Sequence, residues 1–382
     1  MATGPLAGVD LEALRGRRSA KWTFFDDDVL PAWVAEMDFA VAPAITDVLR
    51  DAVERSDLGY SSVAASGLFE SFARFAARRW GWEPDPARAL TITDAVVGVA
   101  ELIEVLSDPG DGIALTVPTY HPFFRIVAEG RRRLVEVPLH DGGDLDVAGI
   151  ERAFAGGARV LLLCNPQNPT GRVVPAAHLE AIAAAAERHD AWVIADEIHA
   201  PLVLPGAEHT VFASVSEAAA ERGFLITSAS KAFNLAGLKC ALAVAASDTA
   251  WERLDRISTI PRYSGHLGVL AAKAAFDEGD EWLAEVVSIL DRNRELLARL
   301  LAERLPDAGY LRPEAGYLAW LDFSAYELGA DPAAALLQRG RIALSPGPQF
   351  GTGGERHARL NFATSPEILT EAVERIASGV AA

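Results

Sequence analysis

The chain has 382 residues, half of them hydrophobic, and it carries 35 Lys and Arg against 53 Asp and Glu, for a formal net charge of -18. A protein with so negative a field repels phosphate backbones and anionic lipids, so this composition argues against a nucleic-acid or a membrane partner. The length exceeds that of one compact core and predicts one large domain together with a smaller one.

The cysteines, the histidines and the first residues narrow the class of protein. Cys164 and Cys240 lie in apolar, strand-like stretches, and their spacing resembles neither a disulfide framework nor a zinc site. The eight histidines are scattered along the chain, so we expect no metal. The start of the sequence lacks the basic and apolar regions of a signal peptide, and no apolar run is long enough to span a membrane. We therefore expect a soluble, cytoplasmic protein.

Short apolar runs alternate with amphipathic stretches from about residue 45 to about residue 275. This alternation is typical of an α/β fold, with a mostly parallel sheet covered by helices. Helices are expected over 67–80 and 178–189, where apolar residues recur at helical spacing. The expected strands cover residues 113–117, 133–137, 160–164, 192–195, 224–227 and 241–245.

The pattern changes at residue 280. Residues 280–305 predict one long helix, and two strands are expected after it, at 317–321 and 357–361. We therefore divide the chain into an N-terminal arm associated with the small domain, a large domain, and a smaller α+β C-terminal domain. These three parts cover residues 1–44, 45–279 and 280–382.

A single lysine, Lys231, follows an apolar run in the sequence Ser228-Ala-Ser-Lys231-Ala-Phe-Asn. A lysine held at the end of a buried strand loses hydration, which disfavours its charged form and makes the amine a nucleophile toward an aldehyde. That is the chemistry of a Schiff base with pyridoxal phosphate. Taken alone, the motif is also compatible with a solvated surface lysine.

Other polar residues follow the expected strands, at the edge where ligands bind in an open parallel sheet. Asp196 could pair with a pyridinium nitrogen, or it could simply cap a helix or join a structural ion pair. Asn168 lies in a turn-rich segment and could donate its amide to a phenolic oxygen, unless that segment is only a sharp turn. Tyr120 could stack its ring on a flat cofactor.

A phosphate group also needs a binding site in so acidic a protein. The segment 93–98, which contains Ala95 and Val96, opens an expected helix, and the free amides at a helix N-terminus bind anions. Ser228 could add a hydroxyl and Lys239 a cation, although a solvated Lys239 would need no explanation.

Three motifs occur in a fixed order: Asn165-Pro-Gln-Asn168-Pro-Thr-Gly171, Asp196-Glu-Ile-His199 and Ser228-Ala-Ser-Lys231-Ala-Phe-Asn. In these motifs and their spacing the chain resembles the fold-type I aminotransferase superfamily of pyridoxal phosphate enzymes, and in finer detail its MalY/PatB branch of cystathionine β-lyases. The resemblance implies a large domain whose mostly parallel seven-stranded sheet lies between helices, plus a smaller α+β C-terminal domain. It spans nearly the whole chain, with matches at Trp33-Val-Ala-Glu-Met-Asp38, Tyr317-Leu-Ala-Trp-Leu and Arg359-Leu-Asn-Phe.

The resemblance assigns roles to single residues. Lys231 and Tyr120 would act in catalysis, Lys231 by forming the Schiff base and Tyr120 from its place on the ring. Arg359 would bind the α-carboxylate of an amino-acid substrate, a task that suits a bidentate guanidinium. Tyr60 would cross a homodimer interface to reach the cofactor and substrate of the other subunit, so that the active sites are shared. The residues implied to bind the cofactor are Lys231, Asp196, Asn168, Tyr120, His199, Ala95, Val96, Ser228, Lys239 and Tyr60.

Three positions depart from the pattern of many aminotransferases. His199 stands where many of them carry a tyrosine, as in the lyase branch. Lys239 stands where many carry an arginine, so the positive charge is kept but the bidentate guanidinium donor is lost. The turn usually written Pro-Gly-Val-Val reads Asp94-Ala-Val-Val here. That change puts a carboxylate beside the expected phosphate.

The resemblance implies a carbon-sulfur β-lyase that acts on L-cystathionine or a related S-substituted cysteine and gives a thiol, pyruvate and ammonia. If the β-carbon carried no leaving group, the same residues would carry out transamination, so a class I/II aminotransferase is the alternative. A regulatory protein that keeps the fold to bind a partner is a third hypothesis, which the complete catalytic set disfavours.

Overall fold

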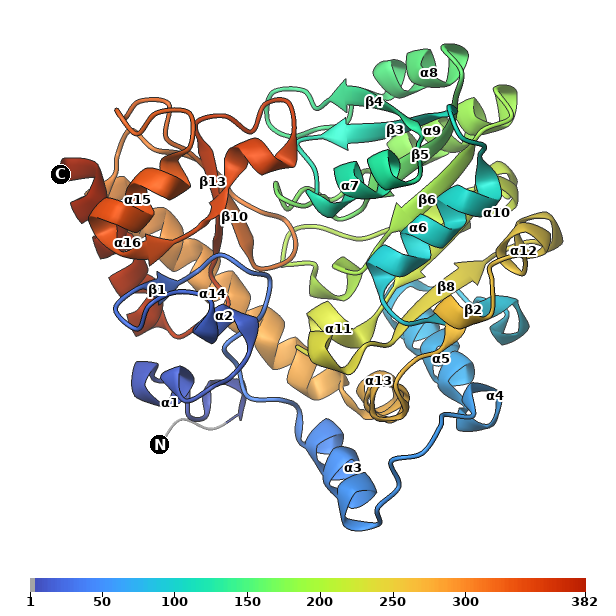
Figure 1. Ribbon diagram of the computed structural model, residues 1–382, viewed down its shortest axis with the longest axis horizontal. Coiled ribbons are helices and arrows are strands. Elements are labelled where there is room, and N and C mark those ends of the chain that lie inside the picture. The colour runs from blue at the N-terminus through green and yellow to red at the C-terminus, as the bar shows by residue number, and fades with distance from the viewer. Residues whose placement is uncertain (1–3) are drawn as a thin grey trace.

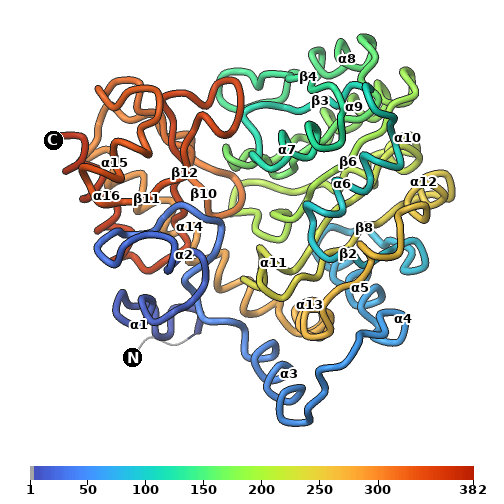
Figure 2. Tube along the Cα trace, in the orientation of Figure 1, coloured from blue at the N-terminus to red at the C-terminus, as the bar shows by residue number. Residues whose placement is uncertain are grey.

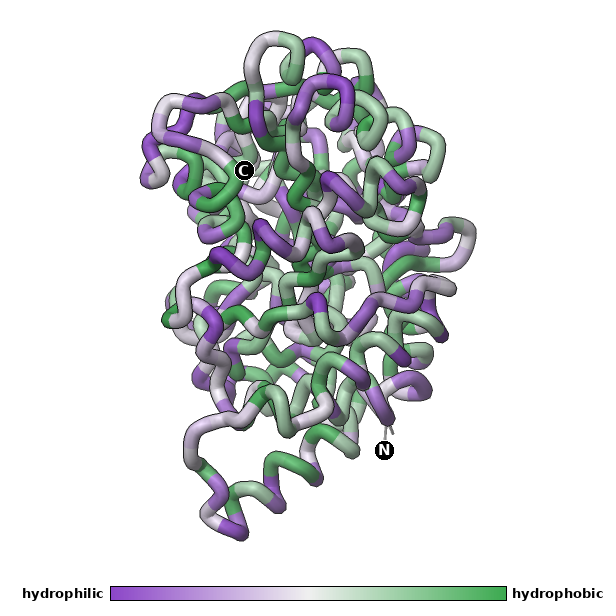
Figure 3. The backbone as a smooth tube through the Cα atoms, turned by 90° about the vertical axis from the view of Figure 1, so that its right-hand side faces the viewer, coloured by the Kyte–Doolittle hydropathy of each residue, from purple (hydrophilic) through white to green (hydrophobic). Residues whose placement is uncertain are grey.

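The computed structural model describes residues 4–382, so the first three residues of the expected N-terminal arm lie outside the described part. Figure 1 shows two parts side by side: a broad sheet between helices, and a smaller part that carries both ends of the chain. Figure 2 traces the same arrangement, with the first segment of the chain running beneath the last. Hydrophilic stretches gather at the outer turns and hydrophobic stretches inside (Figure 3).

The larger part is built on a seven-stranded sheet with the strand order β2-β8-β7-β6-β5-β3-β4. From β7 to β4 all neighbours are parallel, whereas β8 runs antiparallel to both β7 and β2. The mostly parallel α/β sheet is therefore confirmed, and all six expected strands are present. The strands are β2 (Ala89–Ile92), β3 (Gly112–Val117), β4 (Arg133–Pro138), β5 (Ala158–Cys164), β6 (Trp192–Asp196), β7 (Gly223–Thr227) and β8 (Ala241–Ala245).

The side chains of β5 explain why this sheet has helices on both faces. Successive residues of a strand point to opposite faces. Val160 and Leu162 belong to one hydrophobic cluster, whereas Leu161 and Leu163 belong to another, and all four are buried. Both faces of the strand are therefore covered, as expected for parallel strands with continuous apolar runs.

Helices cover both faces of this sheet. The helices expected at 67–80 and 178–189 are confirmed as α5 and α9. The set is α3 (Pro43–Glu54), α4 (Val63–Ser66), α5 (Leu68–Trp80), α6 (Ala95–Leu106), α7 (Pro122–Glu129), α8 (Val147–Ala155), α9 (Ala176–Arg188), α10 (Glu217–Arg222), α11 (Ala229–Ala232), α12 (Asp248–Leu254) and α13 (His266–Glu278). Short 3-10 turns lie at Gly4–Leu6, Pro86–Arg88, Ala200–Leu202, Phe212–Ser214, Ala236–Leu238, Ile260–Arg262 and Gly347–Phe350.

The smaller part begins with the long helix α14 (Asp280–Arg304), which confirms the helix expected at 280–305. An antiparallel sheet of order β12-β13-β10-β9 follows it in the chain. The strand expected at 317–321 lies one residue later than predicted, and the strand expected at 357–361 is present. The elements are β9 (Gly309–Leu311), β10 (Leu318–Asp322), α15 (Pro332–Gly340), β11 (Ile342–Ala343), β12 (Ser345–Pro346), β13 (His357–Asn361) and α16 (Pro366–Ala381).

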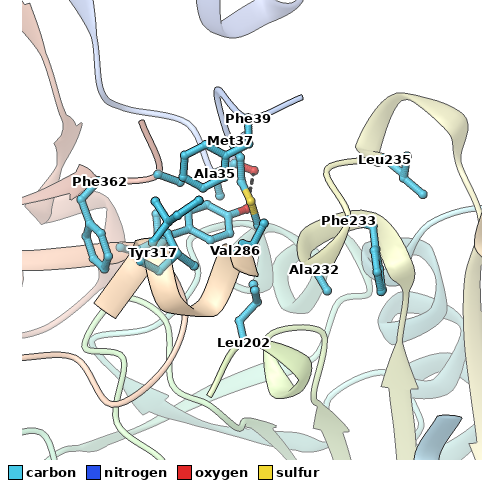
Figure 4. Packing of buried hydrophobic residues seen from close by; sticks show 14 of the residues in the cluster. Ala35, Met37, Phe39, Leu202, Ala232, Phe233, Leu235, Val286, Tyr317 and Phe362 are labelled. Atoms are coloured by element: carbon cyan, nitrogen blue, oxygen red, sulfur yellow. Dashed lines mark hydrogen bonds between the residues drawn. The ribbon is translucent and has the colours of Figure 1, made fainter. Parts of the chain in front are cut away.

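The N-terminal segment joins the smaller part through backbone pairing. After α1 (Leu11–Arg15) and α2 (Ala20–Thr23), strand β1 (Leu30–Pro31) pairs in parallel with β11. Further along, Ala35 lies against Tyr317, and the Tyr317 hydroxyl donates to the Ala35 carbonyl at 3.1 Å (Figure 4). The domain limits at residues 44 and 279 stay a prediction.

The segment between α3 and α4 is exposed. Leu58 keeps 58% of its surface exposed, and Tyr60 is fully exposed. Such apolar side chains are the kind that a second protein surface covers. None of the helices in residues 4–382 is both long and apolar enough to cross a membrane.

Candidate functional site

A cavity of about 190 Å³ lies at the carboxyl ends of β3, β5, β6 and β7. This is the edge at which open α/β sheets bind their ligands. Nine of the predicted site residues line it: Lys231, Asp196, Asn168, Tyr120, His199, Ala95, Val96, Ser228 and Lys239. Arg359 and Tyr60 are not among the lining residues. Most of the residues predicted for the site, which lie between positions 95 and 239 of the chain, are therefore brought together in one cavity.

Lys231 enters the cavity from α11, directly after β7. Ser228 caps this short helix by accepting a hydrogen bond from the Ser230 amide. The Lys231 ammonium donates to the Ala35 carbonyl at 3.0 Å. Burial, together with the charge of Arg359, lowers the pKa of Lys231 to about 8. A useful fraction of the amine is therefore neutral and nucleophilic near neutral pH.

Asp196 is the last residue of β6 rather than the first residue after it. Its carboxylate accepts one hydrogen bond, from the Ile198 amide at 3.2 Å, and the helical turn that follows starts only at Ala200. Asp196 therefore does not cap a helix. Burial raises the pKa of its carboxyl from 3.8 to about 7. A buried carboxylate of this kind gains from a cationic partner inside the cavity.

Asn168 connects the cavity to Arg359. The Arg359 guanidinium donates to the Asn168 amide oxygen at 2.9 Å, to the Trp33 carbonyl at 3.1 Å and to the Ser345 hydroxyl at 3.0 Å. With its oxygen held in this way, the Asn168 side chain turns its NH2 group away from Arg359 as a possible donor to a ligand. Arg359 is 3% exposed, and its Nε atom has no partner among the described residues. Arg359 therefore does not line the cavity itself but is hydrogen-bonded to Asn168, which does.

Tyr120 and His199 add groups that stay uncharged at neutral pH. Burial raises the pKa of the Tyr120 phenol to about 12, so the phenol keeps its proton. Burial, followed by the charges of Lys231 and Arg359, lowers the pKa of His199 to about 3. The His199 imidazole is therefore neutral, and its buried Nδ1 has no hydrogen-bond partner within residues 4–382.

One part of the cavity lining has the features of an anion site. Helix α6 begins at Ala95, and Ala95 and Val96 both line the cavity, so the N-terminus of the helix lies at the cavity. Lys239 brings an ammonium, which pairs with the Asp94 carboxylate at 2.7 Å. Ser228 also lines the cavity, but its hydroxyl donates to the Cys240 carbonyl at 2.6 Å. A bound phosphate would therefore have to redirect that hydroxyl, a constraint that the sequence did not indicate.

Two findings lie outside the predicted set. The Ala35 carbonyl, which holds the Lys231 amine, comes from a chain segment 196 residues away. Its only signal in the sequence was the matching segment Trp33-Val-Ala-Glu-Met-Asp38. Thr93 and Ser230 also line the cavity.

The chemistry of the cavity fits pyridoxal phosphate. The lining includes an amine, an amide donor and a buried carboxylate, and these groups suit an aldehyde, a phenolic oxygen and a ring nitrogen. The helix N-terminus and Lys239 suit the phosphate. Asp196 is buried in this lining and has no cationic partner within residues 4–382, and this is the observation that calls for such a ligand. Among residues 4–382 no three His, Cys, Asp or Glu side chains group as metal ligands would.

Comparison with known proteins shows the family of this chain. Residues 34–376 match the family Aminotransferase class I and II. A cystathionine beta-lyase of Corynebacterium glutamicum is 41% identical, over 97% of this chain and 98% of that protein. The cystathionine beta-lyase PatB of Bacillus subtilis is 32% identical, over 94% of this chain and 96% of that protein. The crystal structure of the PLP-bound C-S lyase from Staphylococcus hominis superposes with a TM-score of 0.90 at 26% identity and covers 96% of both chains. The chain therefore belongs to the class I and II aminotransferase family, and to the branch of that family that contains PatB.

Proposed function

We propose that this chain is a pyridoxal phosphate-dependent carbon-sulfur β-lyase of the cystathionine β-lyase type. It would cleave L-cystathionine or a related S-substituted cysteine into a thiol, pyruvate and ammonia. The observation that carries the proposal is that two groups line the same cavity: a Lys231 amine with a pKa of about 8 and a buried Asp196 carboxyl. The names of the relatives at 32% and 41% identity point to the same reaction.

The cofactor supplies an aldehyde that condenses with amines and a protonated pyridine ring that accepts electrons from the substrate. Lys231 would hold the aldehyde, Asp196 the ring nitrogen and Asn168 the phenolic oxygen. Tyr120 would lie on the ring face. The first turn of α6 and Lys239 would hold the phosphate.

The chain's own residues move the protons. The neutral Lys231 amine takes the proton from the substrate Cα, a step for which a pKa of about 8 is well matched to neutral pH. The Tyr120 phenol stays protonated and lines the same cavity, and we propose that it gives a proton to the departing sulfur. We assign catalysis to these two residues.

Arg359 is assigned to the substrate carboxylate, and Arg359→Lys tests this role. The substitution keeps the positive charge and removes the two-pronged donor. We expect KM for the amino acid to rise by about 10- to 100-fold, with little change in cofactor affinity. Steady-state kinetics and cofactor titration measure the two effects. Arg341→Lys is a matched control, because Arg341 also pairs with carboxylates but lies on the surface. An unchanged KM would place the carboxylate site elsewhere.

Tyr60 is assigned to the active site of a partner subunit in a homodimer. It is fully exposed and does not line the cavity of its own chain. If the sites are shared, a mixture of the inactive variants Tyr60→Ala and Lys231→Ala regains one intact site per mixed dimer. About a quarter of the wild-type rate is expected after random exchange of subunits. Activity that stays at the level of the separate variants would contradict shared sites.

An aminotransferase remains the second candidate, because the family includes such enzymes. A keto-acid substrate with a second carboxylate calls for a second cation. Lys231 and Lys239 are the basic side chains among the cavity residues that the structure describes. Rates for S-substituted cysteines compared with rates for alanine and aspartate, which lack a β-leaving group, separate the two functions. A lyase prefers the first group, and a transaminase turns over the second.

We also propose that the enzyme works in the cytoplasm. The support comes from Cys164 and Cys240, which are both buried free thiols. Reduced thiols are typical of proteins kept in a reducing compartment.

A further inference from the structure

A carboxylate occupies part of the proposed phosphate site. Asp94 is the N-cap of α6, and its Oδ1 atom accepts a hydrogen bond from the Val96 amide at 3.0 Å. That amide is one of the free donors that a helix N-terminus offers to an anion. Asp94 also lines the cavity. The protein's own carboxylate therefore uses a donor that a phosphate could use.

The same carboxylate binds the cation of the site. The second oxygen of Asp94, Oδ2, lies 2.7 Å from the Lys239 ammonium. Lys239 is held in the left-handed region at a φ of +55°, which is unusual for a residue other than glycine. Lys239 lines the cavity, and the Asp94 carboxylate neutralises its ammonium there. Both a helix amide and the ammonium are engaged before any phosphate arrives.

We propose that Asp94 is an internal competitor of the cofactor phosphate, which weakens cofactor binding and lets the cofactor exchange. A phosphate monoester must either share the Val96 amide and Lys239 with this carboxylate or displace it. In either case it meets a like charge at close range, which opposes binding. This inference rests on the proposed function, since pyridoxal phosphate is the phosphate monoester in question.

Removing the charge of Asp94 tests the proposal. Asp94→Asn keeps an oxygen that can cap α6, and Asp94→Gly is also tolerated at an N-cap, so both variants should fold. Asp146→Asn is the matched control. Asp146 caps α8 by accepting from the Gly149 amide at 2.8 Å and pairs with Arg152 at 2.9 Å, but it does not line the cavity.

Two ligands are titrated against the full-length chain after removal of cofactor. Inorganic phosphate, compared with chloride at equal ionic strength, is followed by the rise in unfolding temperature. Pyridoxal phosphate is followed by absorbance. Both Asp94 variants are expected to bind each ligand about tenfold more tightly than wild type, and Asp146→Asn is expected to bind as wild type does.

Unchanged or weaker binding by both Asp94 variants would overturn the competitor role and leave the proposed function intact. Equal tightening by Asp146→Asn would also overturn it, because the effect would then come from net charge alone. A wild-type chain that binds neither phosphate nor pyridoxal phosphate would overturn the proposed function together with this inference.

Discussion

Replacing Lys231 with alanine is expected to lower pyruvate release by about 10³- to 10⁴-fold, because the variant loses the base that acts at the substrate Cα. The Lys231 amine is held by the Ala35 carbonyl, and its pKa is lowered to about 8. Lys239, the other lysine of the cavity, is paired with Asp94 at the proposed phosphate site. It is therefore not placed to replace Lys231.

Lys239→Ala is the matched control for this loss. It removes the same functional group from the proposed phosphate site, so it should weaken cofactor affinity and leave turnover at saturating cofactor within about tenfold of wild type. Borohydride reduction followed by mass spectrometry should add the cofactor mass to wild type and to Lys239→Ala, but not to Lys231→Ala. A Lys231→Ala enzyme that retained several per cent of the rate would move the covalent role to another residue.

The second large effect is expected for Asp196→Asn. The amide keeps the size of the side chain and can still accept from the Ile198 amide, but it carries no negative charge. Without that charge a ring nitrogen would not stay protonated, and we expect turnover to fall by about 10³-fold. Glu197→Gln is a useful comparison, since Glu197 is the neighbouring buried carboxylate but contacts His209 and the Phe212 amide rather than the cavity.

The same substitution should stabilise the cofactor-free protein at high pH. The Asp196 pKa is about 7 in the folded chain and 3.8 as the ordinary value. Between these values the folded state holds a proton that the unfolded state has lost, so wild-type stability falls as pH rises from about 4 to 7. Asn does not titrate, so the advantage of the variant grows through this window to at most ~4 kcal/mol. Urea unfolding of both proteins at pH 5 and pH 8 measures it, and an equal difference at both pH values would contradict the raised pKa of Asp196.

The strands and most of the site could be predicted because local patterns encode them. The runs that became β3 to β8 are mainly apolar, apart from β4 with its Arg133 and Glu136, and polar residues follow several of them where the sheet ends. Strand β2 was missed because Ala89–Ile92 is only four residues long and is defined by its antiparallel pairing with β8, some 150 residues later. Pairing at that distance leaves no local signal.

Contacts between segments that are far apart in the chain also could not be predicted from the sequence. The Arg359 guanidinium holds Asn168 and the Trp33 carbonyl, and these bonds join the smaller part, the larger part and the N-terminal arm. The competition between Asp94 and a phosphate depends on a side-chain position that spacing alone does not give. The sequence therefore indicated that Arg359 and Asp94 belong near the site. Their hydrogen-bond partners became known only from the fold.

Pyruvate release from L-cystathionine by the purified, cofactor-loaded protein, with no keto acid present, distinguishes a β-lyase from an aminotransferase. We expect many turnovers per active site, with thiol and pyruvate formed in equal amounts, because elimination returns the Lys231 site to its starting state. A reaction that stops after about one equivalent per site, and resumes when a keto acid is added, would contradict it. The protein would then be an aminotransferase.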